Sequence, residues 1–386
     1  MAIQELHITD FSPEELAQRV KRTQDAMKTK ELDALIVYDE GGFIGFGSVR
    51  YLAGYSHVAP PVPAYMVVPP SGEQTLVIHR GMAGTQHNMA DVYCPTRRVK
   101  SPPGGHMGPD WAAGLVETLS ESGFSKGKLG VDSLNALRHP VVEGFKSKLP
   151  DAQLVDARGL VEQVRRYKTE AELANFMKAS QISKMGADTF FTLVKEGVPH
   201  DLALAEADHL VRINGGEELN VIMGSGNPWV WGVGARGDLT FKEGELVAIE
   251  LNARYHGYFS QYCRTVALGK VSEDRQRAVT AVRAAHDRAV GMLKPGVTGK
   301  QLFNAALEEV RKRGFDYSQV RYGHGLGLTI GEGFDIGDWD DTPIQEGAFG
   351  VIHPFVINEP GNRGTFNALW GDPWVMRANG PEFVAE

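Results

Sequence analysis

The chain changes its secondary-structure pattern near residue 163, and this change constrains the fold more than any other feature of the sequence. Before it, short apolar runs alternate with stretches of helical spacing, such as the helical stretch 13–30 and the strand-like run 32–38. After it, long helical stretches are separated by strand-like runs at 246–252, 256–268 and 349–357. These patterns predict an α/β domain over residues 1–162 and an α+β domain with a mostly antiparallel sheet over residues 163–386.

Two capping boxes mark the expected starts of helices in the second domain. Thr169 is followed three residues later by Glu172, and Thr298 is followed in the same way by Gln301. In such a box the first side chain accepts a hydrogen bond from the fourth residue, whose own side chain reaches back to the first backbone N–H. The boxes predict a long helix that ends near residue 195 and a second helix over LFNAALEEVRKR.

Composition and charge exclude several classes of protein. The chain has 386 residues, of which 42% are hydrophobic and 23% are charged, as is typical of globular proteins with room for two domains. A net charge of −8 argues against a general nucleic-acid binder. No apolar run approaches the roughly 18–20 residues of a membrane span, and Cys94 and Cys263 are too few for a disulfide scaffold. We therefore expect a cytoplasmic protein that binds neither nucleic acid nor membrane.

Five segments, in order along the chain, resemble those of the pita-bread enzymes, the M24-like family of creatinase, aminopeptidase P and prolidase. They are VRRYKTEAEL, GSGNP, GELVAIELNARYHGYFSQYCRT, GHGLGL and EGAFGVIHP. The glycine-rich segment alone is a weak motif, but five segments in this order and spacing are specific. The resemblance covers nearly the whole chain, since the first domain looks like the smaller N-terminal domain of creatinase. It implies a pita-bread catalytic domain, an α/β N-terminal domain and a homodimer.

The resemblance also identifies five positions at which active members bind two divalent metals with two aspartates, one histidine and two glutamates. In this chain those positions hold Glu250, Gln261, His324, His353 and Gly371. A glutamine amide binds a hard cation weakly and glycine has no side chain, so two of the carboxylates that neutralise the metal charge are missing. We therefore expect no conventional two-metal centre.

Further residues of the family's peptidases are absent. The histidine that lies about eleven residues before their Gly-Asp segment matches Val233, and their His-Glu pair matches Gly331-Glu332. The resemblance therefore implies the fold of a peptidase, with conventional Xaa-Pro peptidase activity the least favoured function.

We expect Glu250, Glu332, His324 and His353 to converge in the cleft as catalytic residues. In a metal-free enzyme, one histidine would act as general acid or base, oriented by a glutamate, in a small-molecule hydrolase or lyase that cleaves a C–N or related bond. Creatinase is the family precedent for metal-free hydrolysis. One alternative is a single Zn, Fe or Mn ion bound by His324, His353 and Glu250. Another is a non-catalytic pita-bread binding protein.

The expected substrate-binding residues are Gln261, Trp229, Trp231, Arg236 and Arg50. Aromatic walls with one cation suit a small organic acid or an aromatic or cationic substrate, and Arg50 is a candidate for binding a substrate carboxylate. The alternatives are that the two indoles pack under the sheet and that Arg50 is an exposed residue at a helix or loop edge. We expect Cys263, where the family usually has threonine, to be a buried structural cysteine.

Overall fold

The chain forms two compact units, Met1–Arg166 and Tyr167–Glu386. The computed structural model describes residues 11–40, 47–55, 63–79, 99–104, 108–132, 134–225, 230–231, 239–316, 321–357 and 367–384, with the backbone alone at 230–231. The predicted domain boundary after residue 162 falls inside helix α7 (Leu160–Val164), which packs against α1 (Pro13–Thr29) in the first unit. None of the described helices is long and apolar enough to cross a membrane.

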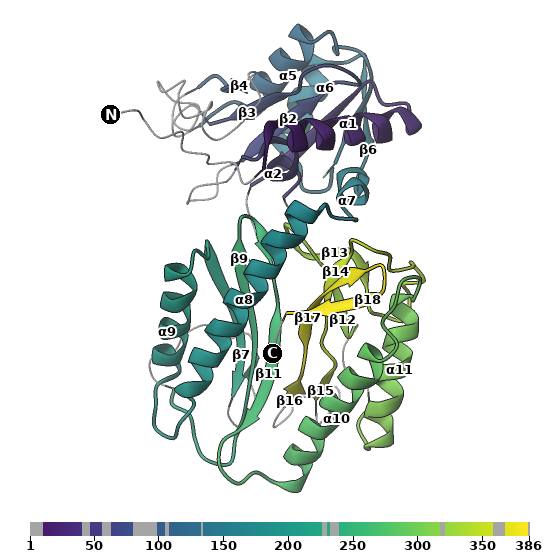
Figure 1. Ribbon diagram of the computed structural model, residues 1–386. Coiled ribbons are helices and arrows are strands. Elements are labelled where there is room, and N and C mark those ends of the chain that lie inside the picture. Colours follow the sequence, from purple (N-terminus) through teal and green to yellow (C-terminus); the bar gives the residue numbers. More distant parts are fainter. Residues whose placement is uncertain are drawn as a thin grey trace, which may run out of the picture. The chain divides into compact units, whose positions relative to one another are not determined.

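The first unit is a mixed sheet with helices, drawn in purple to blue in Figure 1. Its strand order is β4-β3-β2-β1-β5-β6, in which β1 runs antiparallel to β2 and parallel to β5. The strands are β1 (Ala34–Asp39), β2 (Ala64–Val68), β3 (Thr75–Ile78), β4 (Val99–Lys100), β5 (Gly127–Val131) and β6 (Ala152–Asp156). The other helices are α2 (Ser48–Ala53), α5 (Trp111–Glu121) and α6 (His139–Lys148). The predicted α/β fold is confirmed.

The first half of the second unit is a sheet covered by two helices. The strand order is β10-β9-β7-β8, and β11 pairs with another part of β9. The strands are β7 (Glu218–Ser225), β8 (Val230–Trp231), β9 (Leu246–Tyr255), β10 (Tyr258–Phe259) and β11 (Tyr262–Ala267). The helices α8 (Glu170–Thr192) and α9 (His200–Ile213) pack on this sheet through Val247, Ile249 and Leu251 of β9. Because side chains alternate along a strand, Glu250 lies on the opposite face.

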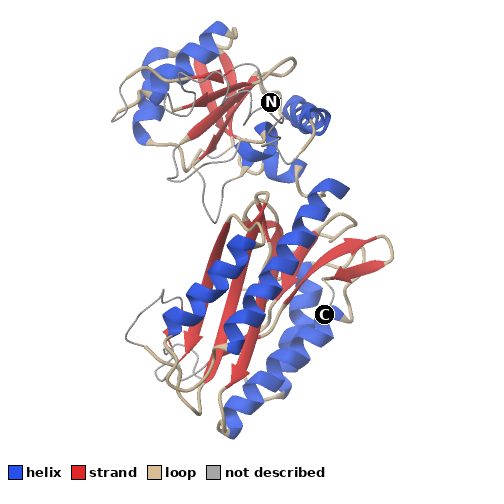
Figure 2. Ribbon diagram, turned by 60° about the vertical axis from the view of Figure 1, so that its left-hand side comes forward, coloured by secondary structure: helices blue, strands red, loops and turns tan. Residues whose placement is uncertain are grey.

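The second half repeats this layering with a second sheet of order β13-β12-β14-β17-β18 and a ribbon formed by β15 and β16. Helices α10 (Glu273–Val290) and α11 (Gly299–Lys312) pack against it around Tyr322 and Trp374. Figure 1 shows these helices on the far side of the strands from α8 and α9, and Figure 2 shows the helices in blue beside the strands in red. The strands are β12 (Gly323–Leu326), β13 (Ile330–Asp335), β14 (Phe349–Ile352), β15 (Phe355–Ile357), β16 (Asn367–Leu369), β17 (Asp372–Arg377) and β18 (Gly380–Phe383).

Every strand pair of the second unit that the structure describes is antiparallel, so the predicted pita-bread α+β fold is confirmed. Both predicted capping boxes form at the starts of α8 and α11. Thr169 N donates to Glu172 Oε2 at 2.9 Å, and Thr298 N donates to Gln301 Oε1 at 3.0 Å. Helix α8 ends at Thr192, slightly before the predicted residue 195.

Candidate functional site

The first part of the candidate site lies on the face of β9 and β11 that points away from α8 and α9. Cys263 is the register partner of Glu250, so their side chains share this face, and Gln261 lies two residues before Cys263. Gln261 is fully buried, and its Nε2 donates to Cys263 Sγ at 3.7 Å. The structure therefore places two of the predicted site residues, Glu250 and Gln261, beside the same cysteine.

Two histidines from the second sheet form the other part of the site. His324 lies in β12 and His353 directly follows β14; their rings meet edge to face with centroids 5.2 Å apart. His324 Nδ1 lies 3.0 Å from Gly325 O and donates its proton there, which leaves Nε2 as an acceptor. His353 Nε2 is buried and has no hydrogen-bond partner among the described residues. The predicted pairing of the two histidines is thus present in the fold.

Burial determines the protonation of this histidine pair. Burial lowers the pKa of His324 well below its ordinary value, and the charges of His353 and Arg321 lower it further. Burial, followed by the charge of Arg321, lowers the pKa of His353 to about 3. Burial in an apolar environment disfavours the charged form of an imidazole. Both rings are therefore uncharged at neutral pH and present lone pairs, not positive charges.

Glu250 has the protonation behaviour of a general acid or base. Its side chain is only partly exposed, and burial raises the pKa of its carboxyl group to about 7, against the opposing effects of Arg321 and Asn252. A catalytic group transfers protons best when its pKa is near the working pH. Burial, with a further contribution from the charge of Glu250, raises the pKa of the Cys263 thiol well above its usual value. Cys263 is free and buried, which favours the structural role expected for it.

Arg321 is a site residue that sequence reasoning missed. It forms an ion pair with Asp335, and its positive charge acts on Glu250, His324 and His353. The available signal was its place three residues before His324, ahead of the glycine-rich segment. An arginine there favours the carboxylate of Glu250 and disfavours protonation of the histidines.

Glu332, the fourth predicted catalytic residue, forms an ion pair with Lys168. Its Oε1 lies 2.9 Å from Lys168 Nζ, and both side chains are almost completely buried. A Cβ atom added at Gly327 would lie 2.4 Å from this carboxyl group, so the β12–β13 turn packs directly on it. These contacts are those of a structural ion pair, and a catalytic role for Glu332 stays a prediction.

The residues at the five family positions do not fit a two-metal centre. Gly371 exchanges backbone hydrogen bonds of 3.0 and 2.9 Å with Cys263, and a Cβ atom at Gly371 would lie 2.6 Å from Ile352 O and 2.7 Å from His353 Cβ. A glutamate therefore has no room there unless the backbone shifts, and Gln261 supplies only a neutral amide. The described residues also contain no group of three His, Cys, Asp or Glu side chains that could hold a metal ion. The single-ion alternative at His324, His353 and Glu250 stays a prediction.

The remaining predicted substrate-binding residues are placed only in part. Trp229 and Arg236 lie outside the described residues, and Trp231 is described only by its backbone, which pairs with Gly224 between β8 and β7. Arg50 lies in α2 of the first unit and is 8% exposed, so it is not the exposed arginine of the alternative interpretation. Its role toward a substrate carboxylate stays a prediction.

Two family models match the chain. The model of the creatinase/prolidase N-terminal domain matches residues 19–167, and the model of metallopeptidase family M24 matches residues 174–375, more than half of the chain. The chain belongs to metallopeptidase family M24. This membership agrees with the segment order of the sequence and with the antiparallel fold of the second unit.

Relatives within the M24 family include two Xaa-Pro dipeptidases. The enzyme of Pyrococcus furiosus is 31% identical over 229 residues, which cover 58% of this chain and 65% of the relative. The enzyme of Pyrococcus horikoshii is 28% identical over 237 residues, which cover 60% of this chain and 68% of the relative. The chain thus matches just under two thirds of the length of the first of these relatives.

Solved structures show the same fold along nearly the whole chain. The prolidase from Pyrococcus horikoshii OT3 superposes with a TM-score of 0.80 at 22% identity, covering 96% of this chain and 98% of that one. The N-terminal domain of FACT complex subunit SPT16 from Cicer arietinum superposes with a TM-score of 0.75 at 14% identity and 96% coverage of both chains. At these identities the similarity shows the fold alone.

The matched family is a metallopeptidase family, and the two relatives named above are hydrolases. The expectation that conventional Xaa-Pro peptidase activity is the least favoured function is not supported, because the M24 relatives with 31% and 28% identity are Xaa-Pro dipeptidases. That expectation rested on substituted ligand positions. Substitutions at ligand positions do not rank the substrates that the remaining residues can bind.

Proposed function

We propose that this M24 protein hydrolyses a C–N bond in a small substrate rich in hydrogen-bond donors, such as a guanidino, amidino or ammonium compound. The observation that carries this proposal is the set of acceptors in the site. His324 and His353 are neutral, and the lone pair of Nε2 is free on His353 and available as an acceptor on His324. Gln261 adds a buried carbonyl oxygen without a hydrogen-bond partner. Buried acceptors are stabilised when a ligand supplies N–H donors.

Glu250 has the central catalytic role in this proposal. The histidines were the expected acid–base groups, but a pKa of about 3 makes His353 a weak base, whereas that of Glu250 is about 7. Ionised Glu250 removes a proton from water as its oxygen attacks the substrate carbon. The protonated carboxyl group then donates that proton to the nitrogen that leaves, so the C–N bond breaks and Glu250 is regenerated. The two imidazoles accept hydrogen bonds from the substrate N–H groups.

The test is a screen of guanidino, amidino, N-methyl amino acid and aromatic acid substrates, with release of ammonia, urea or amine as the signal. For a substrate that is turned over, we expect Glu250→Gln to lower kcat by roughly 100-fold or more. Glu218→Gln, on the neighbouring strand β7, is the matched control because Glu218 forms its ion pair with Arg254 at a partly exposed position. Equal turnover by Glu250→Gln and wild type would rule out the proposed role.

Hydrolysis of Xaa-Pro dipeptides is the second candidate, and the 31% identity to a Xaa-Pro dipeptidase favours it. The same screen should include Xaa-Pro dipeptides with and without added Mn²⁺, Co²⁺ or Zn²⁺. Dipeptide turnover that requires the added ion and survives Glu250→Gln would contradict the acid–base proposal and support Xaa-Pro peptidase activity.

Metal analysis of protein purified without chelator tests the single-ion alternative. Less than about 0.1 equivalents of bound metal per chain would contradict that alternative.

Two further expectations are tested by separate measurements. A non-catalytic binding protein would bind a screened compound in calorimetry without releasing product. The expected homodimer would give twice the chain mass of 42.2 kDa in light scattering. A mass of 42.2 kDa would instead show a monomer.

A further inference from the structure

A cavity lies on the face of β11 opposite to the candidate catalytic residues. It has a volume of about 470 Å³ and is lined by β11, β17 and β18 together with α8 and α10. Because side chains alternate along β11, Tyr262 and Arg264 point into this cavity while Gln261 and Cys263 point to the catalytic face. Its volume lies within the range of roughly 300–1,000 Å³ of small-molecule sites. The cavity is therefore separate from the proposed active site and large enough for a ligand.

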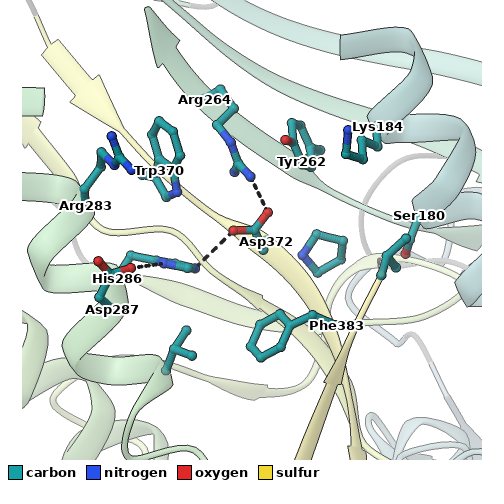
Figure 3. Close-up of a pocket in the computed structure, with 13 residues that line it drawn as sticks. Ser180, Lys184, Tyr262, Arg264, Arg283, His286, Asp287, Trp370, Asp372 and Phe383 are labelled. Atoms are coloured by element: carbon teal, nitrogen blue, oxygen red, sulfur yellow. Dashed lines mark hydrogen bonds and ion pairs between the residues drawn. The ribbon is translucent and has the colours of Figure 1, made fainter. Parts of the chain in front are cut away.

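One wall of the cavity alternates cations and aromatic rings. The guanidinium carbon of Arg283 lies 4.6 Å from the centroid of the Trp370 ring. The guanidinium carbon of Arg264 lies 4.2 Å from the Trp370 centroid and 4.0 Å from the Tyr262 centroid. Figure 3 shows these four side chains in a row, with Lys184 beyond Tyr262. Cations stacked on rings keep their N–H groups free at the edges to bind other groups.

Arg264, at the centre of this row, is already fully engaged. Its Nη1 donates to the carbonyl oxygens of Cys263 and Gly371, each at 2.8 Å, and its Nη2 donates to Asp372 Oδ1. The other oxygen of Asp372 lies 3.6 Å from His286 Nε2, as the dashed lines of Figure 3 show. Arg264 and Asp372 therefore hold β11 and β17 together and are not available to a ligand.

Arg283 is the cation that remains available. It is exposed on α10, and no carboxylate among the described residues forms an ion pair with it, whereas Lys184 is paired with Asp188 at 2.8 Å. His286 and, further, the charge of Arg283 lower the pKa of Asp287, whose Oδ1 lies 3.3 Å from His286 Nδ1. The cavity also has apolar lining from Phe383 of β18 and Val290 of α10. An arginine that is not held in an ion pair, beside apolar side chains, is complementary to a ligand with one negative charge and one apolar part.

We propose that this cavity is a binding site for a small organic carboxylate with an apolar or aromatic body. The carboxylate pairs with Arg283, and the body packs against Phe383 and Val290. Because the cavity lies on the other face of β11 from Gln261 and Cys263, this ligand is not the substrate of the reaction proposed above. The proposal does not depend on the reaction assigned to Glu250.

Calorimetry with three matched probes tests the proposal on the full chain. We expect 3-phenylpropionate to bind, and 3-phenylpropanol, which keeps the body and lacks the charge, to bind at least roughly tenfold more weakly. Acetate, which keeps the charge and lacks the body, should also be at least roughly tenfold weaker. Absence of 3-phenylpropionate binding at millimolar concentration, or equal binding of the alcohol, would overturn the proposal.

Variants locate the bound probe. Arg283→Gln should weaken 3-phenylpropionate binding by roughly tenfold to a hundredfold, whereas Arg288→Gln, an exposed position on the same helix, should leave it unchanged. Glu250→Gln should also leave it unchanged, because Glu250 lies on the other face. Should Arg283→Gln fold poorly, Val290→Phe narrows the cavity from its apolar wall and should weaken binding in the same way. Binding that Glu250→Gln abolishes and both cavity variants retain would place the probe in the catalytic site.

Discussion

Lys168 Nζ lies 2.9 Å from Glu332 Oε1, and these two side chains are 2% and 1% exposed. Lys168 lies just before α8, where its backbone N–H donates to Gly347 O at 3.0 Å, and its ammonium group also lies over the ring of Phe349 at 4.8 Å. Glu332 belongs to β13 in the second sheet. The buried pair therefore fastens the start of the long helix to the C-terminal sheet that carries His324.

Removal of one partner of this pair should destabilise the fold strongly. Glu332→Gln and Lys168→Met each leave a buried charge without its partner, so each should lower the free energy of unfolding by about 3–5 kcal/mol in urea denaturation. The double variant Lys168→Met/Glu332→Leu should lose less than the sum, because it buries no charge. If Glu332→Gln were as stable as wild type and yet inactive, Glu332 would be catalytic, as the sequence suggested.

The pH dependence of turnover should report Glu250. With a pKa raised to about 7, the base is protonated in acid, so kcat/KM of the free enzyme should rise through an inflection near pH 7. Glu250→Asp should retain an inflection, whereas Glu250→Gln should remove it together with most of the activity. An inflection that persists in Glu250→Gln would assign it to another group and exclude Glu250 as the base.

Much of the fold could be predicted because its determinants are local. The capping boxes at Thr169 and Thr298 fix helix starts through hydrogen bonds within four residues, and both form as predicted. The short strand β4 could not be predicted from the sequence, since two residues carry too little periodicity to identify a strand. Its pairing with β3 depends on contacts between residues more than 20 positions apart.

The candidate site was harder to predict because its chemistry depends on burial. The sequence singled out Glu250, His324 and His353, but it could not show that burial lowers the pKa of both imidazoles and raises that of Glu250 to about 7. The partner of Glu332 was also invisible, because Lys168 is 164 residues away along the chain. Arg321 was not predicted as a site residue, because its charge partners lie close to it only in the folded chain. The spacing of residues along the sequence does not show them.

Stability should change with pH in opposite directions for Glu250 and the histidines. The pKa of Glu250 rises from 4.5 to about 7 on folding, so its folded form holds a proton that the unfolded form has lost. Its contribution is fully present below pH 4.5 and is lost as the pH rises to about 7, by at most about 3 kcal/mol. Glu250→Gln should therefore be more stable than wild type at pH 8 and lose that advantage at pH 4, as measured by urea denaturation.

The histidines affect the stability of the fold at acidic pH. Because the pKa of His353 falls from 6.5 to about 3 on folding, the unfolded chain binds a proton that the folded chain does not, and stability falls as the pH drops from 6.5 toward 3. His353→Gln should flatten this acid branch of the stability curve. His139→Gln, at a surface helix start in the first unit, is the control and should leave the branch unchanged. An unchanged branch in His353→Gln would mean that the ring is accessible to water.

The close packing at Gly371 leads to a final prediction about the lost metal site. A Cβ atom there would lie 2.6 Å from Ile352 O, so Gly371→Ala must shift the β14–β17 pair and should cost about 1–3 kcal/mol of unfolding free energy. Gly108→Ala is the matched control, because a Cβ atom at Gly108 meets nothing within 4 Å. For the same reason Gln261→Asp/Gly371→Glu should remain unable to bind two Mn²⁺ ions in equilibrium dialysis. Two bound ions in a stable double variant would show that the backbone shifts enough to make room for the glutamate. Only the side chains at positions 261 and 371 would then prevent a two-metal centre.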